Sequence, residues 1–149
     1  INNYKNITAD AGYESEENYL FLEANNQIVF IKPANYEISK TRKYKNDIGK
    51  IENMEYDKIS DFYTCKNNRK LTVSHIRHNK TKTGYVSEKT IYTCENCSDC
   101  PYKSDCIKDN NCKTPLGERT KVLQVAKTFI KHRKEDLNES YQMKGYCIG

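Results

Sequence analysis

The order of hydrophobic and polar positions in the first part of the chain predicts a strand, a helix and a second strand. Asn6–Asp10 has the character of a short strand that ends in a carboxylate, and Ala11–Tyr13 forms the turn after it. A helix follows, because Ser15 is a good cap and an apolar face is supplied by Tyr19, Leu20, Leu22 and Ala24. Gln27–Ile31 is an uninterrupted apolar run typical of a buried strand. The pattern therefore predicts a βαβ unit.

Asp10 has a position of chemical interest in this unit. Side chains that bind ligands or act in catalysis gather at the carboxyl ends of strands in open α/β sheets. Asp10 would lie at such an end. It is therefore the first candidate for a catalytic or metal-binding carboxylate.

Residues 34–60 are mostly polar and are predicted to form a surface connection. Beyond them, three runs rich in β-branched and aromatic residues predict short strands at 62–65, 71–76 and 90–93. A group of cysteines follows directly. A β-ribbon with cysteines on its turns is typical of small modules that a metal ion holds together, because such modules have little core.

The last apolar pattern predicts an amphipathic helix over Arg119–Leu137. Its apolar residues at roughly helical spacing are Val122, Ala126, Phe129, Ile130 and Leu137. Four basic residues lie mostly on the other faces, namely Lys127, Lys131, Arg133 and Lys134. We therefore expect a basic helix near the end of the chain.

Composition restricts the class of protein. The 149 residues, 36% of them hydrophobic, suffice for one ordinary domain with a moderate core. No window approaches eighteen apolar residues, and the first residues lack the basic start and apolar stretch of a signal peptide. We therefore expect a cytoplasmic protein without a membrane segment.

Charge is distributed unevenly along the chain. Residues 1–64 carry 8 Lys and Arg against 11 Asp and Glu, whereas residues 65–149 carry 17 against 9. A basic half favours a polyanionic partner such as DNA, although 20 of the 25 basic residues are lysine, as in proteins from AT-rich genomes. The candidate DNA-binding residues are Arg42, Lys43, Lys45, Lys127, Lys131, Arg133 and Lys134.

Five of the seven cysteines lie within nineteen residues, between Cys94 and Cys112. Two overlapping Cys-x-x-Cys steps can direct thiolates at one point, which suits a tetrahedral zinc site. The predicted ligands are Cys94, Cys97, Cys100 and Cys106, and either Cys65 or Cys112 is able to replace one of them. Free thiols, an iron–sulfur site and a disulfide staple are the alternatives that the spacing leaves open.

Three segments also occur in a distinctive order and spacing. The first is Ala9-Asp10-Ala11-Gly12-Tyr13, which leads into a helix with Asn18. The second is Tyr56-Asp57, then Asp61-Phe62-Tyr63-Thr64-Cys65, with Leu71 beyond. The third begins at Tyr92-Thr93-Cys94 and continues through Cys97, Cys100-Pro101 and Cys106. Across residues 8 to about 137 this arrangement closely resembles the catalytic region of bacterial insertion-sequence transposases of the DDE class.

The resemblance implies a ribonuclease-H-like fold, and DNA as the partner. It implies that Asp10 is the second of three carboxylates that hold two Mg²⁺ ions during DNA cleavage and strand transfer. It further implies a catalytic part at residues 1–55, a Cys-rich β insertion at 56–116, and a helix that returns to the catalytic part within 117–149.

Two of the three acids have no counterpart in this sequence. The first would precede the segment that begins at residue 1, and the tail from about residue 138 does not match the helix that carries the third. We therefore expect a partial DDE catalytic domain that is inactive on its own. The alternative is a zinc-stapled module that binds DNA or protein without catalysis.

Overall fold

The computed structural model describes residues 4–9, 11–108 and 112–134. The chain divides into two compact units, which are described separately. The first consists of Ile1–Glu37, Asn79–Glu88 and Ala126–Gly149, and the second of Ile38–His78 and Lys89–Val125. Among the described residues, no helix is both long enough and apolar enough to cross a membrane.

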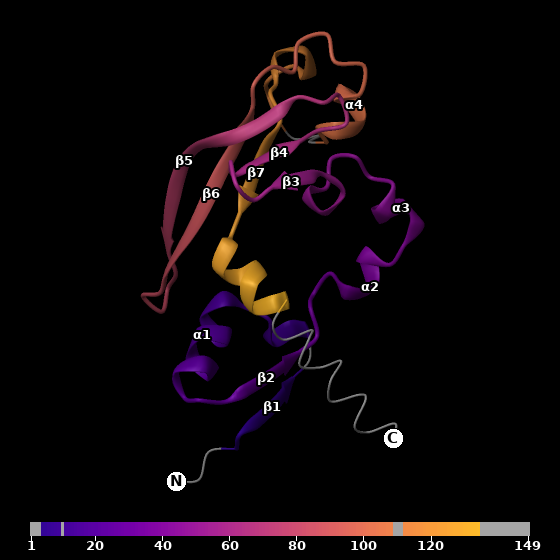
Figure 1. Cartoon of the computed structure of the whole chain (residues 1–149). Helices are drawn as coiled ribbons and strands as arrows, with labels where there is room; N and C mark the ends of the chain where they lie inside the picture. Colours follow the sequence, from indigo (N-terminus) through magenta and orange to yellow (C-terminus); the bar gives the residue numbers. More distant parts are fainter. Residues whose placement is uncertain (1–3, 10, 109–111, 135–149) are drawn as a thin grey trace. The chain divides into compact units, whose positions relative to one another are not determined.

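The first unit contains the predicted βαβ element (Figure 1). Strand β1 (Asn6–Ala9) pairs in parallel with β2 (Ile28–Ile31), with Asn6 opposite Ile28 and Ala9 opposite Ile31. Between the two strands lie a 3₁₀ turn, η1 (Ala11–Tyr13), and helix α1 (Glu16–Ala24). The predicted strand, helix and strand are confirmed.

Both ends of α1 follow from local sequence. The Ser15 side chain accepts a hydrogen bond from the Asn18 amide at 3.1 Å, and Glu16 and Glu17 lie at the positive end of the helix dipole. Asn26 has a φ of 55°, a left-handed conformation that Asn adopts more readily than most residues. The helix therefore ends at Ala24, directly before Asn25 and Asn26.

A helix over residues 127–134 packs against α1. The Tyr19 ring lies 5.9 Å from the Phe129 ring and is stacked on the His132 ring at 5.8 Å. His132 Nε2 also lies 2.7 Å from a carboxylate oxygen of Glu23. The tip of a hairpin adds to the same unit, because the Tyr85 hydroxyl donates to Glu16 at 2.8 Å.

A buried ion pair joins this helix to the segment before α1. The Glu14 side chain is only 1% exposed and accepts from Arg133 Nε at 2.8 Å, from the Ala34 amide at 2.7 Å and from the Tyr19 hydroxyl at 2.8 Å. Burial alone would raise the pKa of Glu14, but these three donors outweigh it and lower that pKa. Arg133 also lies over the Phe129 ring, 4.5 Å from its centre.

The second unit is built on a five-stranded antiparallel sheet. Its spatial order follows the sequence: β3 (Glu55–Asp57), β4 (Phe62–Thr64), β5 (Lys70–Lys80), β6 (Val86–Cys94) and β7 (Val122–Val125). The three predicted strands are confirmed as β4, β5 and β6, and the last two are longer than predicted. Residues 79–88, where β5 turns into β6, belong to the first unit.

The predicted surface connection over residues 34–60 is only partly correct. It contains two single-turn helices, α2 (Tyr36–Ser39) and α3 (Arg42–Lys45), and a 3₁₀ turn, η2 (Ile51–Asn53). It then supplies an edge strand, β3, which pairs with β4, and the Met54 side chain just before that strand is buried. The sequence pattern did not predict β3, because an edge strand of three residues buries little apolar surface and can therefore have a polar sequence.

The predicted helix over Arg119–Leu137 is wrong in its first part. Residues Val122–Val125 form β7, which pairs with β6. Leu123 and Val125 are buried, whereas Val122 and Gln124 are exposed, which is the alternation of a strand. The helix covers the described residues 127–134, so the basic C-terminal helix is confirmed only there. Pairing with β6 overrides the helical spacing of the apolar residues.

The core of this sheet is partly aromatic. Leu71 and Tyr92 are fully buried, and the Tyr63 ring meets the Tyr92 ring edge-on at 5.0 Å. The Tyr92 and Tyr56 hydroxyls donate to the same Asp61 oxygen at 2.6 and 2.5 Å. Burial, followed by this hydrogen bond to a carboxylate, raises the pKa of Tyr92.

Replacing Arg133 with Ala should destabilise the chain strongly. The substitution leaves the Glu14 carboxylate buried without its charged partner, and breaking such a pair costs about 3–5 kcal/mol. Urea unfolding followed by circular dichroism measures the effect. The matched control is Lys131→Ala on the exposed face of the same helix, which should change the free energy of unfolding by less than about 0.5 kcal/mol. Equal effects of the two substitutions would contradict the role of the ion pair.

The Glu14 interaction should also depend on pH. Because the pKa of Glu14 is lower in the folded chain than its ordinary value of 4.5, its stabilisation is present above pH 4.5 and is lost as the pH falls through the folded pKa. Urea unfolding of the wild type and of Glu14→Gln at a series of pH values tests this. The two free energies of unfolding should differ most near neutral pH and converge in acid. A difference that stayed constant with pH would show that the charge of Glu14 is not responsible.

Candidate functional site

Asp10, the candidate catalytic carboxylate, lies outside the described residues. Its neighbours on either side are the last residue of β1 and the first residue of η1. Its predicted roles, in catalysis and in holding Mg²⁺, therefore stay predictions. Among the described residues, no three His, Cys, Asp or Glu side chains are arranged so that they could hold a metal ion as they stand.

Most of the predicted thiols line one small cavity in the second unit. The cavity has a volume of about 20 Å³ and is lined by Cys65, Cys94, Cys97, Cys100 and Cys106. Cys65 follows β4, Cys94 ends β6, and Cys106 ends a single-turn helix, α4 (Lys103–Cys106). Cys112 is exposed and does not line this cavity. Of the two cysteines that could replace a predicted ligand, Cys65 lines the cavity and Cys112 does not.

The turn between β4 and β5 is tied to the cysteine loop by Arg69. Its guanidinium donates to the carbonyl oxygens of Asn96 at 2.6 Å and of Ser98 at 3.0 Å. A backbone hydrogen bond of 2.9 Å from Glu95 to the Lys70 carbonyl runs alongside it. These bonds place Cys65 next to thiols that are almost thirty residues away in sequence.

Lys121, just before β7, contacts the thiol cavity from the other side. Its backbone amide donates to the Cys97 sulfur at 3.3 Å, and its ammonium donates to the Cys106 carbonyl at 2.9 Å. The Cys94 amide in turn donates to the Lys121 carbonyl at 3.0 Å. Strand pairing between β6 and β7 therefore fixes one wall of the cavity.

The thiols influence one another electrostatically. Burial, and then the neighbouring Cys97 and Cys65, raise the pKa of Cys94 to about 12. Burial also raises the pKa of Cys106, and the thiols of Cys65, Cys97 and Cys100 add to that effect, whereas the Lys121 ammonium opposes it. Three thiols from two other chain segments thus lie within electrostatic reach of Cys106.

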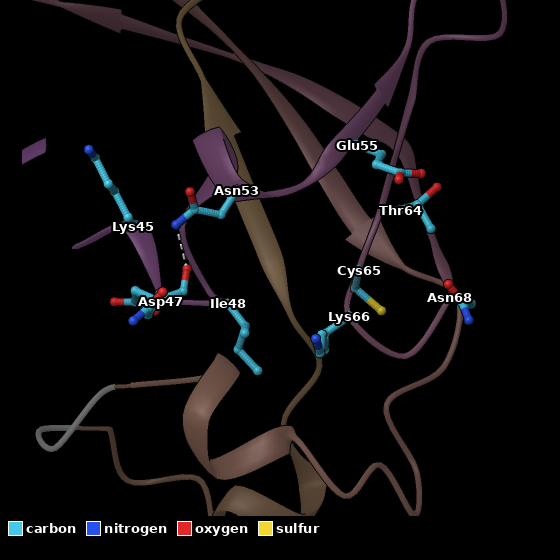
Figure 2. Close-up of a pocket in the computed structure, with 10 residues that line it drawn as sticks. Lys45, Asp47, Ile48, Asn53, Glu55, Thr64, Cys65, Lys66 and Asn68 are labelled. Atoms are coloured by element: carbon cyan, nitrogen blue, oxygen red, sulfur yellow. Dashed lines mark hydrogen bonds between the residues drawn. The ribbon is translucent and has the colours of Figure 1, made fainter. Parts of the chain in front are cut away.

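A larger polar pocket of about 470 Å³ lies in the same unit. Figure 2 shows Lys45 and Asp47 on one side of it, and Glu55 and Thr64 on the other. Asp47 is paired with Lys108 at 3.2 Å and accepts from the Gly49 amide at 3.0 Å. Cys65 lines this pocket as well as the thiol cavity.

The predicted DNA-binding residues fall on both units. Arg42, Lys43 and Lys45 are exposed on α3. On the helix over residues 127–134, the lysines at positions 127, 131 and 134 are exposed and share one face, because they are separated by four and three residues. Arg133 lies on the opposite face of that helix with Phe129 and His132, and its guanidinium is bound by Glu14.

The model of one protein family, the transposase DDE domain, matches residues 64–145, more than half of the chain. The chain belongs to the transposase DDE domain family. Searches of curated proteins and of solved structures returned no match. The part of this transposase domain that matches runs from Thr64 through β5, β6, the cysteine loop and β7. Asp10 and the βαβ element precede the matched range.

Two features of this transposase domain were not predicted from sequence. The carboxylate of Glu14 and the guanidinium of Arg133 are separated by more than a hundred residues, and no local pattern links them. The sequence names Cys65 and Cys112 as equal substitutes, and the bonds of Arg69 that favour Cys65 go to backbone carbonyls, which carry no sequence signal. An alignment that showed these positions varying together could have found both.

Proposed function

We propose that this chain is part of the catalytic domain of a bacterial insertion-sequence transposase, which cleaves DNA and transfers its strands. The observation that carries the proposal is the family match over residues 64–145. The motif around Asp10 and the order of the cysteine segments support the insertion-sequence type. DNA is the partner that this family implies.

We further propose that the βαβ element belongs to a ribonuclease-H-like fold. Its support is the parallel pairing of β1 with β2 and the position of Asp10 directly after β1. Mg²⁺ in such domains activates the attacking water or 3′-hydroxyl and stabilises the leaving oxygen. Asp10 is the residue of this chain proposed to hold it. The Cys-rich β segment, residues 56–116, is then an insertion into this fold.

The DNA contact is proposed to use two basic surfaces. The first, called the lysine face, consists of Lys127, Lys131 and Lys134, all exposed. Three charges on one helical face can follow a row of phosphates, whereas Arg133 is occupied by Glu14. The second surface consists of the exposed Arg42, Lys43 and Lys45 of α3.

Replacing the three residues of the lysine face with Gln should weaken DNA binding and make it less dependent on salt. Each phosphate contact contributes about 0.9 to the slope of log K against log salt, so the slope should fall by up to about 3. Fluorescence anisotropy with a labelled DNA duplex, titrated at several NaCl concentrations, measures this slope.

A control variant removes the same charge from isolated exposed lysines, Lys5, Lys58 and Lys113. Its salt dependence should stay close to that of the wild type. If both triple variants lose the same amount of binding, net charge is responsible and the lysine face has no special role.

The alternative function, a DNA- or protein-binding module without catalysis, is favoured by one observation. The second unit contains its own sheet, all five cavity thiols and the basic residues of α3. In that case only the α3 surface should bind DNA. Loss of binding on replacing Arg42, Lys43 and Lys45, with none on changing the lysine face, would favour the module.

The 149 residues alone should show no specific DNA cleavage. Two Mg²⁺ ions require more carboxylates than the single one that matches the family motif, so we expect these residues to hold the metal ions too weakly for turnover. The measurement is incubation of the purified chain with Mg²⁺ or Mn²⁺ and a DNA duplex that carries the ends of the proposed insertion element. Specific nicking above the level of an Asp10→Asn control would contradict this expectation.

A further inference from the structure

The thiol cavity has the size of a single small ion. A cavity must offer roughly 10–15 Å³ to hold one water molecule, and this one offers about 20 Å³. Five sulfur-bearing side chains surround that volume. A space of that size, bordered by thiols, matches one tetrahedral metal ion better than a cluster of several irons.

The charges around the cavity suit such an ion. Arg69, Lys103 and Lys121 line it together with the cysteines. Four thiolates around one Zn²⁺ carry more negative than positive charge, so the complete centre is an anion. Three cations beside it would offset that charge. The backbone amide of Lys121, which donates to the Cys97 sulfur, is a further donor suited to a thiolate.

We propose that this cavity binds one structural Zn²⁺ through Cys65, Cys97, Cys100 and Cys106. The choice rests on position: these four cysteines line the cavity from the turn after β4, the loop after β6 and the end of α4. Cys94 is the fifth thiol, and its sulfur donates to the Asn96 carbonyl at 3.5 Å instead. Cys65 thus takes the place that the sequence spacing gives to Cys94.

Metal binding requires the four sulfurs to turn inward, because zinc–sulfur bonds are about 2.3 Å long. As described, the cysteines do not yet form a coordinating group. Rotation about the Cα–Cβ bond moves a sulfur between staggered positions without a change of backbone. The backbone already brings the segments together, since Arg69 joins the turn after β4 to the cysteine loop.

The ion would staple three segments that share little apolar surface. These are the turn after β4, the loop after β6, and α4. None of the described residues in these three segments has a buried side chain. Binding free energy of a metal can replace the missing core in such a place.

The test is elemental analysis of the full 149-residue chain, purified without chelator under reducing conditions. The wild type should contain about one zinc ion per chain. Cys65→Ser, Cys97→Ser, Cys100→Ser and Cys106→Ser should each lose most of it, whereas Cys94→Ser and the exposed Cys112→Ser should keep it.

Reconstitution of the wild type with Co²⁺ gives a second measurement that does not depend on whether the variants fold. Tetrahedral thiolate coordination should produce intense d–d bands in visible light, and Zn²⁺ should abolish them. Retention of zinc by Cys65→Ser together with its loss from Cys94→Ser would overturn the ligand assignment. Iron with inorganic sulfide, or well under half an equivalent of zinc and no cobalt bands, would overturn the site itself.

Discussion

The second unit depends on the burial of one strand, β6. Ile91, Tyr92 and Cys94 are at most 4% exposed, and the strand is flanked by β5 on one side and β7 on the other. The stretch from Thr90 to Cys94 is buried almost throughout, so its backbone amides and carbonyls must be paired and both neighbours are required. Because β6 ends at Cys94 and β7 begins just after Lys121, the same pairing also positions one wall of the thiol cavity.

Much of the aromatic surface around β6 comes from tyrosine, whose hydroxyl group needs a hydrogen-bond partner when it is buried. The chain has twelve Tyr, four Phe and no Trp, so the large side chains available to it mostly carry a hydroxyl. A buried hydroxyl needs an acceptor, and Asp61 accepts from both Tyr56 and Tyr92. Asp61 has a φ of 53°, in the left-handed region that Asp adopts with comparatively little strain. The turn between β3 and β4 is therefore held by the buried Tyr92 and by Tyr56, which is exposed.

Elements with signals inside a short window could be predicted from the sequence. Helix α1 is one, because Ser15 caps its start and Asn25 and Asn26 end it. The strands β4, β5 and β6 are others, since their runs of β-branched and aromatic residues are local. The grouping of the later cysteines around one cavity also followed from spacing alone.

Features decided by distant partners could not be predicted in this way. Residues Val122–Val125 have apolar spacing compatible with a helix, and only pairing with β6 makes them a strand. Arg133 has the sequence context of a solvent-exposed base, but Glu14 holds it in the first unit. The sequence does not choose between Cys65 and Cys112 as a substitute ligand, and it is the bonds of Arg69 and the backbone bond from Glu95 to Lys70 that bring Cys65 next to the later thiols. In each case, contacts between residues far apart in the sequence determine the local structure or the position of the side chain.

The polar pocket and the thiol cavity share parts of their walls, through one close approach of the backbone and one common cysteine. A Cβ atom at Gly49 would lie 2.5 Å from the Cys106 carbonyl oxygen, so only glycine lets the chain between α3 and η2 pass so near α4. Cys65 lines both spaces. A change that moved Cys65 or Cys106 would therefore shift walls of the pocket as well as those of the cavity. If the cysteine side chains are held rigidly, the residues that line the pocket, including Asp47, keep the arrangement that Figure 2 shows.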